Sequence, residues 1–233
     1  MMEALSNALQ PYKGIVGQTA SIVTIAQFFS GAFICKDIYK KKSTAGIQAV
    51  PFIGGITIGI LMLKLALLMN DAAMLQVNVA AIVLNVLYLA FYYYYSADKY
   101  NEVLKPGSVG VALVAVFMGY SIVEDPELLE YRYSLVVTIL MLALIGAPLL
   151  DVKGIIDKGD ASSIPFPLTF MGTIVTALWL IYGIILKNEF MVVQNVIGFL
   201  LCLVQLVLIF KYPAPSGQTK NKAKSKKKSA KRD

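Results

Sequence analysis

Long apolar runs without a charged residue alternate along this chain with short segments rich in Lys, Asp and Glu. A helix needs roughly 20 residues to cross a hydrocarbon core of about 30 Å. Seven runs approach or exceed this length, and they cover residues 14–35, 43–63, 72–97, 106–123, 133–150, 161–186 and 190–210. The second run continues past Lys64, whose long side chain is expected to snorkel to the membrane surface. The pattern predicts an all-α membrane protein with seven transmembrane helices.

Composition agrees with this interpretation. The chain is 58% hydrophobic and 15% charged, and its mean hydropathy is +0.69, as is typical of a protein built for lipid. The amino terminus lacks the basic-then-apolar order of a signal peptide, so we expect the first helix to be retained. There is no His, and the two Cys lie in or at the end of apolar runs. We therefore expect no disulfide framework, no metal and no cofactor.

The positive charges are unevenly divided between the two sides that seven spans create. With the carboxyl end in the cytosol, the inner loops and tail hold seventeen Lys and Arg residues, and the outer side keeps Lys13, Arg132 and Lys187. The positive-inside rule therefore predicts an outer amino terminus and a cytosolic carboxyl terminus. The basic tail "KNKAKSKKKSAKR" fits either a solvated segment or one attracted to anionic membrane lipid. Nucleic acid is not an expected partner.

Two apolar segments contain carboxamides at similar depth, although lipid offers an amide no partner. The stretch "AMLQVNVAAI" holds Gln76 and Asn78, and "FMVVQNVIGF" holds Gln194 and Asn195. The separation of Asn78 and Asn195, 117 residues, also aligns Gly31 with Pro148 farther upstream. The loops "KKKSTAGIQAVPF" and "DKGDASSIPFP" then align as well. These matches indicate an internal repeat of three helices.

The odd fourth helix determines how the two repeats are related. One extra span between two three-helix units makes the units parallel, and parallel repeats in transporters hold the substrate near the membrane midplane between them. The predicted organisation is an outer amino terminus over residues 1–13, a first triple-helix repeat over 14–95, a loop and linker helix over 96–130, a second triple-helix repeat over 131–211 and a basic cytoplasmic tail over 212–233.

Several motifs in order resemble the SWEET sugar facilitators, a branch of the PQ-loop superfamily. They are "FFSGAFICKDIYKKKS", "VPFIGG", "LLMND" and "FMVVQNVIGFLLC", which look like the animal and particularly the arthropod members. The resemblance implies two parallel triple-helix bundles joined by a linker helix, a 3+1+3 arrangement. It also implies bidirectional facilitated diffusion of mono- or disaccharides by alternating access, and it is compatible with a homo-oligomer.

The resemblance implies a sugar site formed by Asn78, Asn195 and Trp179. An amide offers donors and an acceptor to sugar hydroxyls, and an indole face suits the apolar face of a pyranose. The alternative for each Asn is a hydrogen bond between helices, and for Trp179 an anchor at the membrane interface. Met62 and Thr176 align with pocket-sizing positions of the family, and Met62 suggests a narrow pocket that favours a monosaccharide.

The same resemblance implies gates at both ends of the site. Family members carry four Pro residues near the inner helix ends, matched here by Pro51, Pro148 and Pro165, with Gly31 at the fourth position. Because Gly permits a bend without forcing one, hinge symmetry between the halves is in question. Pro51 and Pro165 equally fit ordinary helix starts. Tyr182 and Asn188 resemble the outer gate.

Other functional classes fit the sequence less well. A receptor coupled to a G protein does not explain the repeat or the short loops. The main alternative is a PQ-loop transporter of amino acids or another small organic solute, yet Phe follows both Pro51 and Pro165 where such proteins carry Gln. An enzyme needs paired carboxylates, metal ligands or an activated nucleophile, and no span carries such a set at mid-membrane.

We therefore expect a non-enzymatic sugar transporter without proton coupling. Its partners are a small sugar and the surrounding membrane lipid. The plasma membrane is favoured over the Golgi apparatus or endosomes, although no sorting signal is apparent in the sequence. A scaffold tethered by the basic tail is a third possibility, which deletion of residues 219–233 tests, because a transporter keeps its flux without the tail.

Overall fold

The computed structural model describes residues 2–146 and 149–213, and every regular element within these ranges is helical. The elements are α1 (Met2–Leu9), the 3-10 turn η1 (Gln10–Tyr12), α2 (Lys13–Phe28), α3 (Gly31–Lys41), α4 (Val50–Leu68), α5 (Ala72–Tyr95), the π turn η2 (Tyr100–Leu104), α6 (Lys105–Val123), α7 (Pro126–Gly146), α8 (Leu149–Lys158), α9 (Phe166–Ile185) and α10 (Glu189–Lys211). The expected all-helical fold is confirmed.

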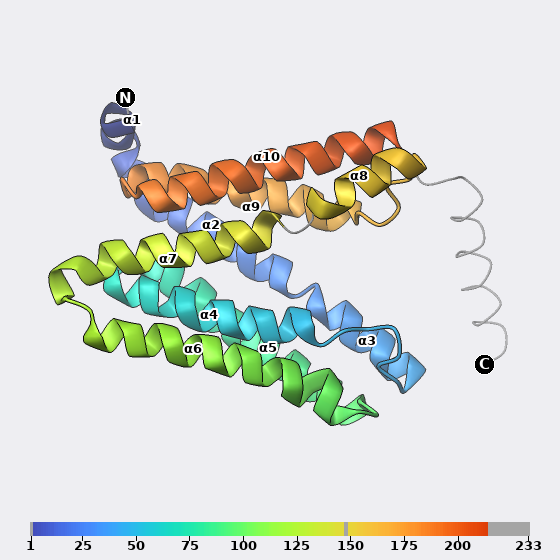
Figure 1. The fold of residues 1–233 in the computed structure, drawn as a ribbon. Helices are drawn as coiled ribbons and strands as arrows, with labels where there is room; N and C mark the ends of the chain where they lie inside the picture. Colours follow the sequence, from blue (N-terminus) through green and yellow to red (C-terminus); the bar gives the residue numbers. More distant parts are fainter. Residues whose placement is uncertain (1, 147–148, 214–233) are drawn as a thin grey trace.

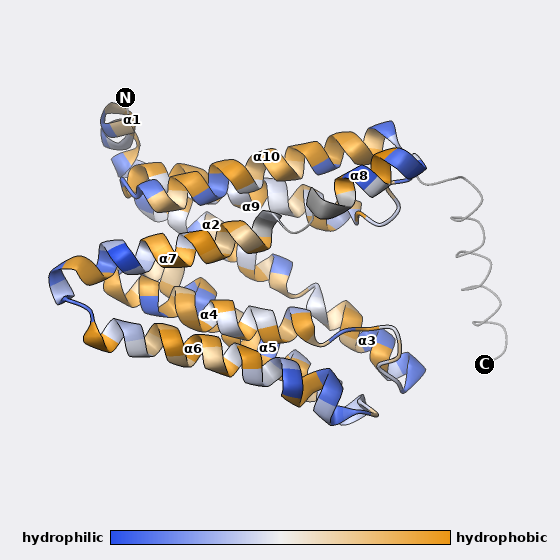
Figure 2. Ribbon diagram, viewed as in Figure 1, coloured by the Kyte–Doolittle hydropathy of each residue, from blue (hydrophilic) through white to orange (hydrophobic). Residues whose placement is uncertain are grey.

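Among the described residues, six helical stretches are long and apolar enough to cross a membrane. They are Met2–Lys41, Val50–Leu68, Ala72–Tyr95, Tyr100–Val123, Phe166–Ile185 and Glu189–Lys211. Figure 2 shows apolar residues along the middle of these helices and hydrophilic residues near their ends. Large apolar side chains such as Ile22, Val111 and Ile122 are exposed. This outward apolar surface, with backbone groups paired inside helices, is what lipid requires.

The helices form two groups along the chain, with α6 between them in sequence. We refer to α2–α5 as the first helix group and to α7–α10 as the second (Figure 1). Helix α4 packs on α5, and α9 packs on α10, which also contacts α7. Helix α2 contacts both α5 and α9, and α6 packs on α4. The two groups therefore meet along α2, and also where α4 contacts α7.

Helices α5 and α10 begin in the same way. The Asp71 side chain accepts from the Met74 N–H at 2.9 Å, and the Asn188 side chain accepts from the Met191 N–H at 2.8 Å. Such N-caps satisfy a backbone donor that the helix leaves free. The residues before these caps, Asn70 and Lys187, both have positive φ, 50° and 56°. The turn is thus repeated in both groups, and we call this end of the molecule the capped end.

The first apolar run is bent, although one helix was expected over residues 14–35. Helix α2 ends at Phe28 and α3 begins at Gly31. The Tyr88 hydroxyl donates to the Phe28 carbonyl at 3.3 Å, and a Cβ added to Gly31 would lie 2.4 Å from the Tyr88 ring. Gly31 therefore lets the ring of α5 approach the bend closely, and the tyrosine satisfies a carbonyl that the break frees.

Proline marks most of the differences between expected and observed helix starts. Helix α4 begins at Val50 with Pro51 in its first turn, and α9 begins directly after Pro165. Helix α7 begins at Pro126, before the expected residue 133, and the Asp125 side chain accepts from the Glu127 N–H at 2.9 Å. Proline suits a first helical turn because its missing N–H has no partner there anyway.

Candidate functional site

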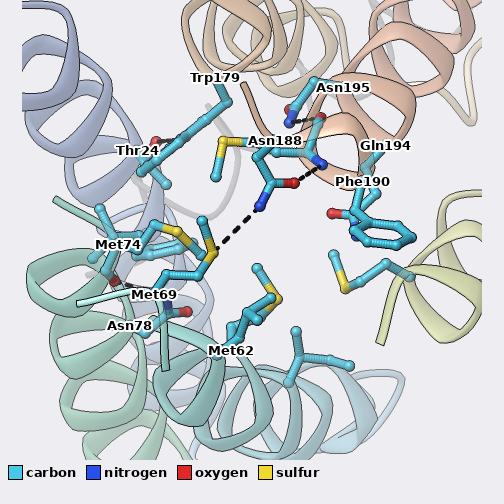
Figure 3. Close-up of a pocket in the computed structure, with 16 residues that line it drawn as sticks. Thr24, Met62, Met69, Met74, Asn78, Trp179, Asn188, Phe190, Gln194 and Asn195 are labelled. Carbon is cyan, nitrogen blue, oxygen red and sulfur yellow. Dashed lines mark hydrogen bonds between the residues drawn. The ribbon is translucent and has the colours of Figure 1, made fainter. Parts of the chain in front are cut away.

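A cavity of about 290 Å³ lies between the two helix groups, on the side of the capped end. Its walls come from α2, α4, α5, α7, α9 and α10 (Figure 3). The polar lining consists mainly of four carboxamides, Asn78, Asn188, Gln194 and Asn195. Five methionines, Met62, Met69, Met74, Met141 and Met191, supply much of the apolar lining. Since none of the described lining residues is charged, the cavity suits a neutral solute.

Asn78 and Asn195 make the same local hydrogen bond on their two helices. The Asn78 Nδ2–H donates to the Met74 carbonyl at 2.8 Å, and the Asn195 Nδ2–H donates to the Met191 carbonyl at 2.8 Å. Each bond spans one helical turn and fixes the amide's orientation. No further bond joins either amide to a described residue, so each keeps an oxygen and a second N–H for a ligand.

Trp179 is 9% exposed and contributes to the cavity wall from α9. Its Nε1–H donates to the Thr24 hydroxyl at 2.9 Å, which ties α9 to α2 across the two groups. The Thr24 hydroxyl itself donates to the Ala20 carbonyl at 2.7 Å. Because the indole N–H is occupied, what Trp179 offers a ligand is its ring face.

Tyr182 and Asn188 lie at the capped end, where contacts join the two groups. The Tyr182 hydroxyl donates to the Asp71 carboxylate at 2.7 Å, and the Asn188 Nδ2–H contacts the Met69 sulfur at 3.4 Å. Tyr182 is 3% exposed and packs edge-on against Trp179, with ring centroids 5.6 Å apart. We call the Asp71–Tyr182 and Asn188–Met69 contacts the outer seam.

The two predicted pocket-sizing residues occupy different environments. Met62 lines the cavity from α4. Thr176 is not among the lining residues that the structure describes, and its hydroxyl donates to the Gly172 carbonyl at 2.8 Å. Its methyl group would lie 3.1 Å from a Cβ added to Gly198. Thr176 therefore packs between α9 and α10.

The predicted hinge residues lie away from the cavity. Gly31 begins α3 at the bend described above, Pro51 lies in the first turn of α4, and Pro165 caps α9. Pro148 lies outside the described residues. The structure thus joins Asn78, Asn195, Trp179, Met62 and Asn188 around one cavity, and the three hinge residues that it describes are not among the lining residues.

Sequence reasoning missed several residues at the site. Asp71 holds Tyr182, Thr24 holds Trp179, and Gln194 lines the cavity and donates to Thr138 on α7 at 2.5 Å. The repeat offset could have indicated some of them, because the separation that aligns Asn78 with Asn195 also aligns Asp71 with Asn188 and Val77 with Gln194. Gln76, by contrast, is exposed and not part of the described lining.

The fold and cavity define a class of protein: a multi-pass helical membrane protein that encloses an uncharged, partly polar cavity between two helix groups, as membrane transporters do. A family model described as "Sugar efflux transporter for intercellular exchange" matches residues 14–100 and 132–216. Because these two stretches cover most of the sequence, the chain belongs to this family.

Known proteins agree with the family assignment. The chain is 30% identical to "Sugar transporter SWEET1" of Drosophila pseudoobscura pseudoobscura, over 87% of this chain and 90% of that protein. It is 28% identical to "Sugar transporter SWEET1" of Rattus norvegicus, over 85% and 90% of the two chains. The structure of a eukaryotic SWEET transporter superposes with a TM-score of 0.78 at 21% identity, covering 88% of this chain and 98% of that chain. The resemblance inferred from the motifs is therefore confirmed.

Proposed function

We propose that this chain is a bidirectional sugar uniporter, in which a neutral sugar binds in the cavity and leaves on either side by alternating access. The observation that carries the proposal is the matched pair of carboxamides, Asn78 and Asn195, held in the same geometry on opposite walls of one uncharged cavity. The names of the similar proteins support sugar as the solute class. The uncharged lining disfavours amino acids, whose two charged groups need partners.

The cavity volume bears on the size of the sugar. At about 290 Å³ it lies at the small end of ligand pockets, which run from about 300 to 1,000 Å³. Trp179 offers a flat face at one wall and Met62 narrows another. We therefore favour a single sugar ring over a disaccharide. Such transport requires no covalent step, so no enzymatic activity is proposed.

We further propose the 3+1+3 arrangement of seven transmembrane helices. Helix α7 is then the seventh of them, because it is not among the six long apolar stretches described above. Helix α7 has 21 residues and packs on α10, and the two family-model matches leave a central segment that contains α6. The first repeat then covers residues 14–95, the linker segment 96–130 and the second repeat 131–211, between the amino terminus at 1–13 and the tail at 212–233. The capped end faces outward and the carboxyl terminus faces the cytosol, following the positive-inside rule.

The outer seam supports a role for Tyr182 and Asn188 as the outer gate. Its polar contacts are few and local, so they can separate while each helix group stays packed. At the other end, the bend at Gly31 and the helix starts at Pro51 and Pro165 are the proposed hinges. Membrane lipid surrounds the chain, the plasma membrane is the proposed location, and association with further copies stays a prediction from the family.

Uptake in cells tests the proposal. Radiolabelled glucose, trehalose and sucrose are offered to transport-deficient cells that express the wild type or the Asn78→Ala, Asn195→Ala double variant at equal surface abundance. We expect glucose flux in the wild type and its loss in the double variant, since two hydrogen-bonding groups are removed from a polar site. Flux is expected to follow the sugar gradient and to ignore a pH gradient.

Asn85 provides the matched control. It lies on α5 and its Nδ2–H donates to the Ala81 carbonyl at 2.8 Å, as Asn78 does to Met74, but it is not among the described cavity residues. Asn85→Ala should keep its flux. Equal flux in the double variant and the wild type would mean that the paired amides only join helices. A wild type that carries none of the sugars but exports amino acids would replace the proposal with the PQ-loop alternative.

A further inference from the structure

We infer that Gln194 is a third sugar-binding carboxamide, present in the second helix group only, which fixes the orientation of the sugar in the cavity. The inference rests on the sugar-binding function proposed above. Gln194 is 8% exposed and lies beside Asn195 on α10, and both line the cavity. The corresponding position in the first group is Val77, which also lines the cavity.

A hydrogen bond to α7, on the side away from the cavity, fixes the Gln194 amide. Its Nε2–H donates to the Thr138 hydroxyl of α7 at 2.5 Å, and Thr138 is itself 5% exposed. No fully enclosed side-chain nitrogen or oxygen among the described residues lacks a hydrogen-bond partner. Since the Gln194 Oε1 has no partner in the described part of the chain, it must open to the cavity. Figure 3 shows this oxygen directed toward the middle of the lining residues.

The matched positions of the cavity are therefore chemically unequal. The repeat offset pairs Asn78 with Asn195 and Met74 with Met191, and these pairs are identical. It pairs Val77 with Gln194, where an apolar residue faces an amide. A solute between two equal walls could bind in two orientations, but the second wall offers the adjacent amides of Gln194 and Asn195 as well as Asn188, and the first wall offers Asn78 alone. A sugar with its hydroxyls toward α10 satisfies more polar groups, so one orientation is favoured.

Sugar hydroxyls are suitable partners for the Oε1 atom of Gln194. A hydroxyl can donate to the Gln194 oxygen while accepting from the free N–H of a neighbouring amide, as Asn195 offers. A site built to hydrogen-bond a hydroxyl rejects an analogue that lacks it, because the buried polar group is left unpaired. Gln194 should therefore make the protein sensitive to one particular hydroxyl of the ring.

The chain contains its own probe of the cavity. Trp179 is the sole tryptophan in the sequence, and it lines the same cavity. Its fluorescence in the purified full-length protein should report binding of D-glucose and of its 2-, 3-, 4- and 6-deoxy derivatives. We expect the wild type to bind one deoxyglucose about tenfold more weakly than glucose, from loss of one hydrogen bond.

Gln194→Leu should weaken glucose binding about tenfold and abolish discrimination against that one deoxyglucose. Thr138→Val removes only the group that holds the amide, so it should reduce the same discrimination partially. Gln205→Leu is the matched control, since Gln205 lies on α10, accepts from Thr169 at 3.4 Å and is not part of the described lining. It should leave the whole series unchanged.

Two results overturn the inference and separate it from the proposed function. If Gln194→Leu weakens glucose and all four deoxyglucoses by the same factor, or changes none of them, Gln194 only joins α10 to α7. In that case the wild type still binds and carries sugar, so the proposed function stands. If the wild type shows neither a fluorescence response nor uptake with any sugar, the proposed function fails and this inference fails with it.

Discussion

Two tyrosines contact α2 and α3 through a glycine, one near the start of α2 and one at the bend where α3 begins. At the capped end, a Cβ added to Gly17 would lie 2.7 Å from the ring of Tyr182, which belongs to the second helix group. At the bend, a Cβ added to Gly31 would lie 2.4 Å from the ring of Tyr88, which belongs to the same group as Gly31. The local geometry is similar, but one contact joins the groups and the other lies within one.

The surroundings of the two tyrosines differ in which helix groups they connect. Tyr88 lies in an apolar cluster with six other buried residues of the first group and its neighbouring π turn: Ile38, Ala49, Phe52, Ile53, Tyr92 and Val103. Tyr182 also lies in an apolar cluster, but that cluster holds residues of both groups, among them Ala20, Met74 and Trp179. In addition, the Tyr182 hydroxyl donates to the Asp71 carboxylate across the groups. Contacts within one group can stay in place when the groups separate, whereas contacts between the groups must break. The comparison predicts that opening toward the outside separates the outer seam, whereas the contacts of Tyr88 at the bend stay in place during that step.

The largest expected effect comes from Tyr182→Phe. The variant leaves Asp71, which is 6% exposed, without its partner across the seam. A hydrogen bond to a charged group contributes about 1.5–3 kcal/mol. The conformation in which the outer seam is separated should therefore gain about 10- to 100-fold in population. We expect a cysteine placed at Val77, in a background without Cys35 and Cys202, to react correspondingly faster with an impermeant thiol reagent added from outside.

Tyr88→Phe is the control for that prediction. It removes the hydroxyl that donates to Phe28 at 3.3 Å, a bond within one group. Labelling of the cavity cysteine should stay at the wild-type rate. If both tyrosine variants accelerate labelling equally, the distinction between seam and bend is wrong.

The second effect separates the two glycines. Gly31→Ala forces a methyl group against the Tyr88 ring in a packed cluster, and overpacking costs about 1–3 kcal/mol, so the melting temperature should fall. Gly17→Ala presses on Tyr182, but the seam can relieve this by opening, so cavity labelling should rise with a smaller loss of melting temperature. Gly54→Ala is the control on α4, because nothing lies within 4 Å of the added Cβ. An equal melting loss in both glycine variants would contradict the comparison.

The sequence predicted the parts of the fold that depend on repeated local chemistry. Asn78 and Asn195 were found because an amide in an apolar run is costly, and that cost is visible without a structure. The apolar pattern predicts one helix over residues 14–35, with Gly31 where the family has a Pro. The break after Phe28 is accompanied by a hydrogen bond from Tyr88, which lies far away in sequence. The sequence predicts that the fifth span begins at residue 133, because the charged residues before it are typical of a loop. Helix α7 in fact begins at Pro126, a residue that suits a helix start.

The missed site residues act through contacts between helices. The position of Asp71 in the sequence predicts only an ordinary N-cap, and nothing in the sequence connects Asp71 with Tyr182. Gln194 and Thr138 become partners only when α10 packs on α7. Thr176 aligns with a family pocket position, yet the side of α9 that faces the cavity depends on the helix's rotation. Local pattern could not supply that rotation.

A smaller effect is expected for Glu102→Gln, which tests the packed region near η2. The Glu102 carboxylate accepts from Thr44 at 3.1 Å, from Tyr92 at 3.2 Å and from Ser96 at 2.7 Å. An amide keeps one acceptor oxygen, so we expect a cost of about 1 kcal/mol. Amide hydrogen exchange in residues 43–49 should become faster, while cavity labelling should not change. Faster labelling in this variant would show that this region is coupled to the seam.

The smallest effect concerns a partly exposed link between α6 and α7. The Glu124 carboxylate accepts from the Tyr120 hydroxyl, and from Arg132 at 3.0 Å. These hydrogen bonds, that from Tyr120 first, lower the pKa of Glu124 below its ordinary value. A lowered folded-state pKa means that the stabilisation is complete above the unfolded value, about 4.3, and is lost as the pH falls through the lowered pKa.

Melting measured from pH 7 to pH 3 tests this link, with Glu124→Gln as the reference because it cannot ionise. The difference in melting temperature between the wild type and the variant should be constant from pH 7 to about pH 5 and should shrink below about pH 4. It should be small throughout, since the Arg132 side chain is 51% exposed and an ion pair with a solvent-exposed partner contributes little. A difference that instead grows on acidification, or that exceeds the effect of Gly31→Ala, would mean that the link between α6 and α7 contributes more to stability than the packed bend does. The contrast between a separable seam and a packed bend would then no longer hold.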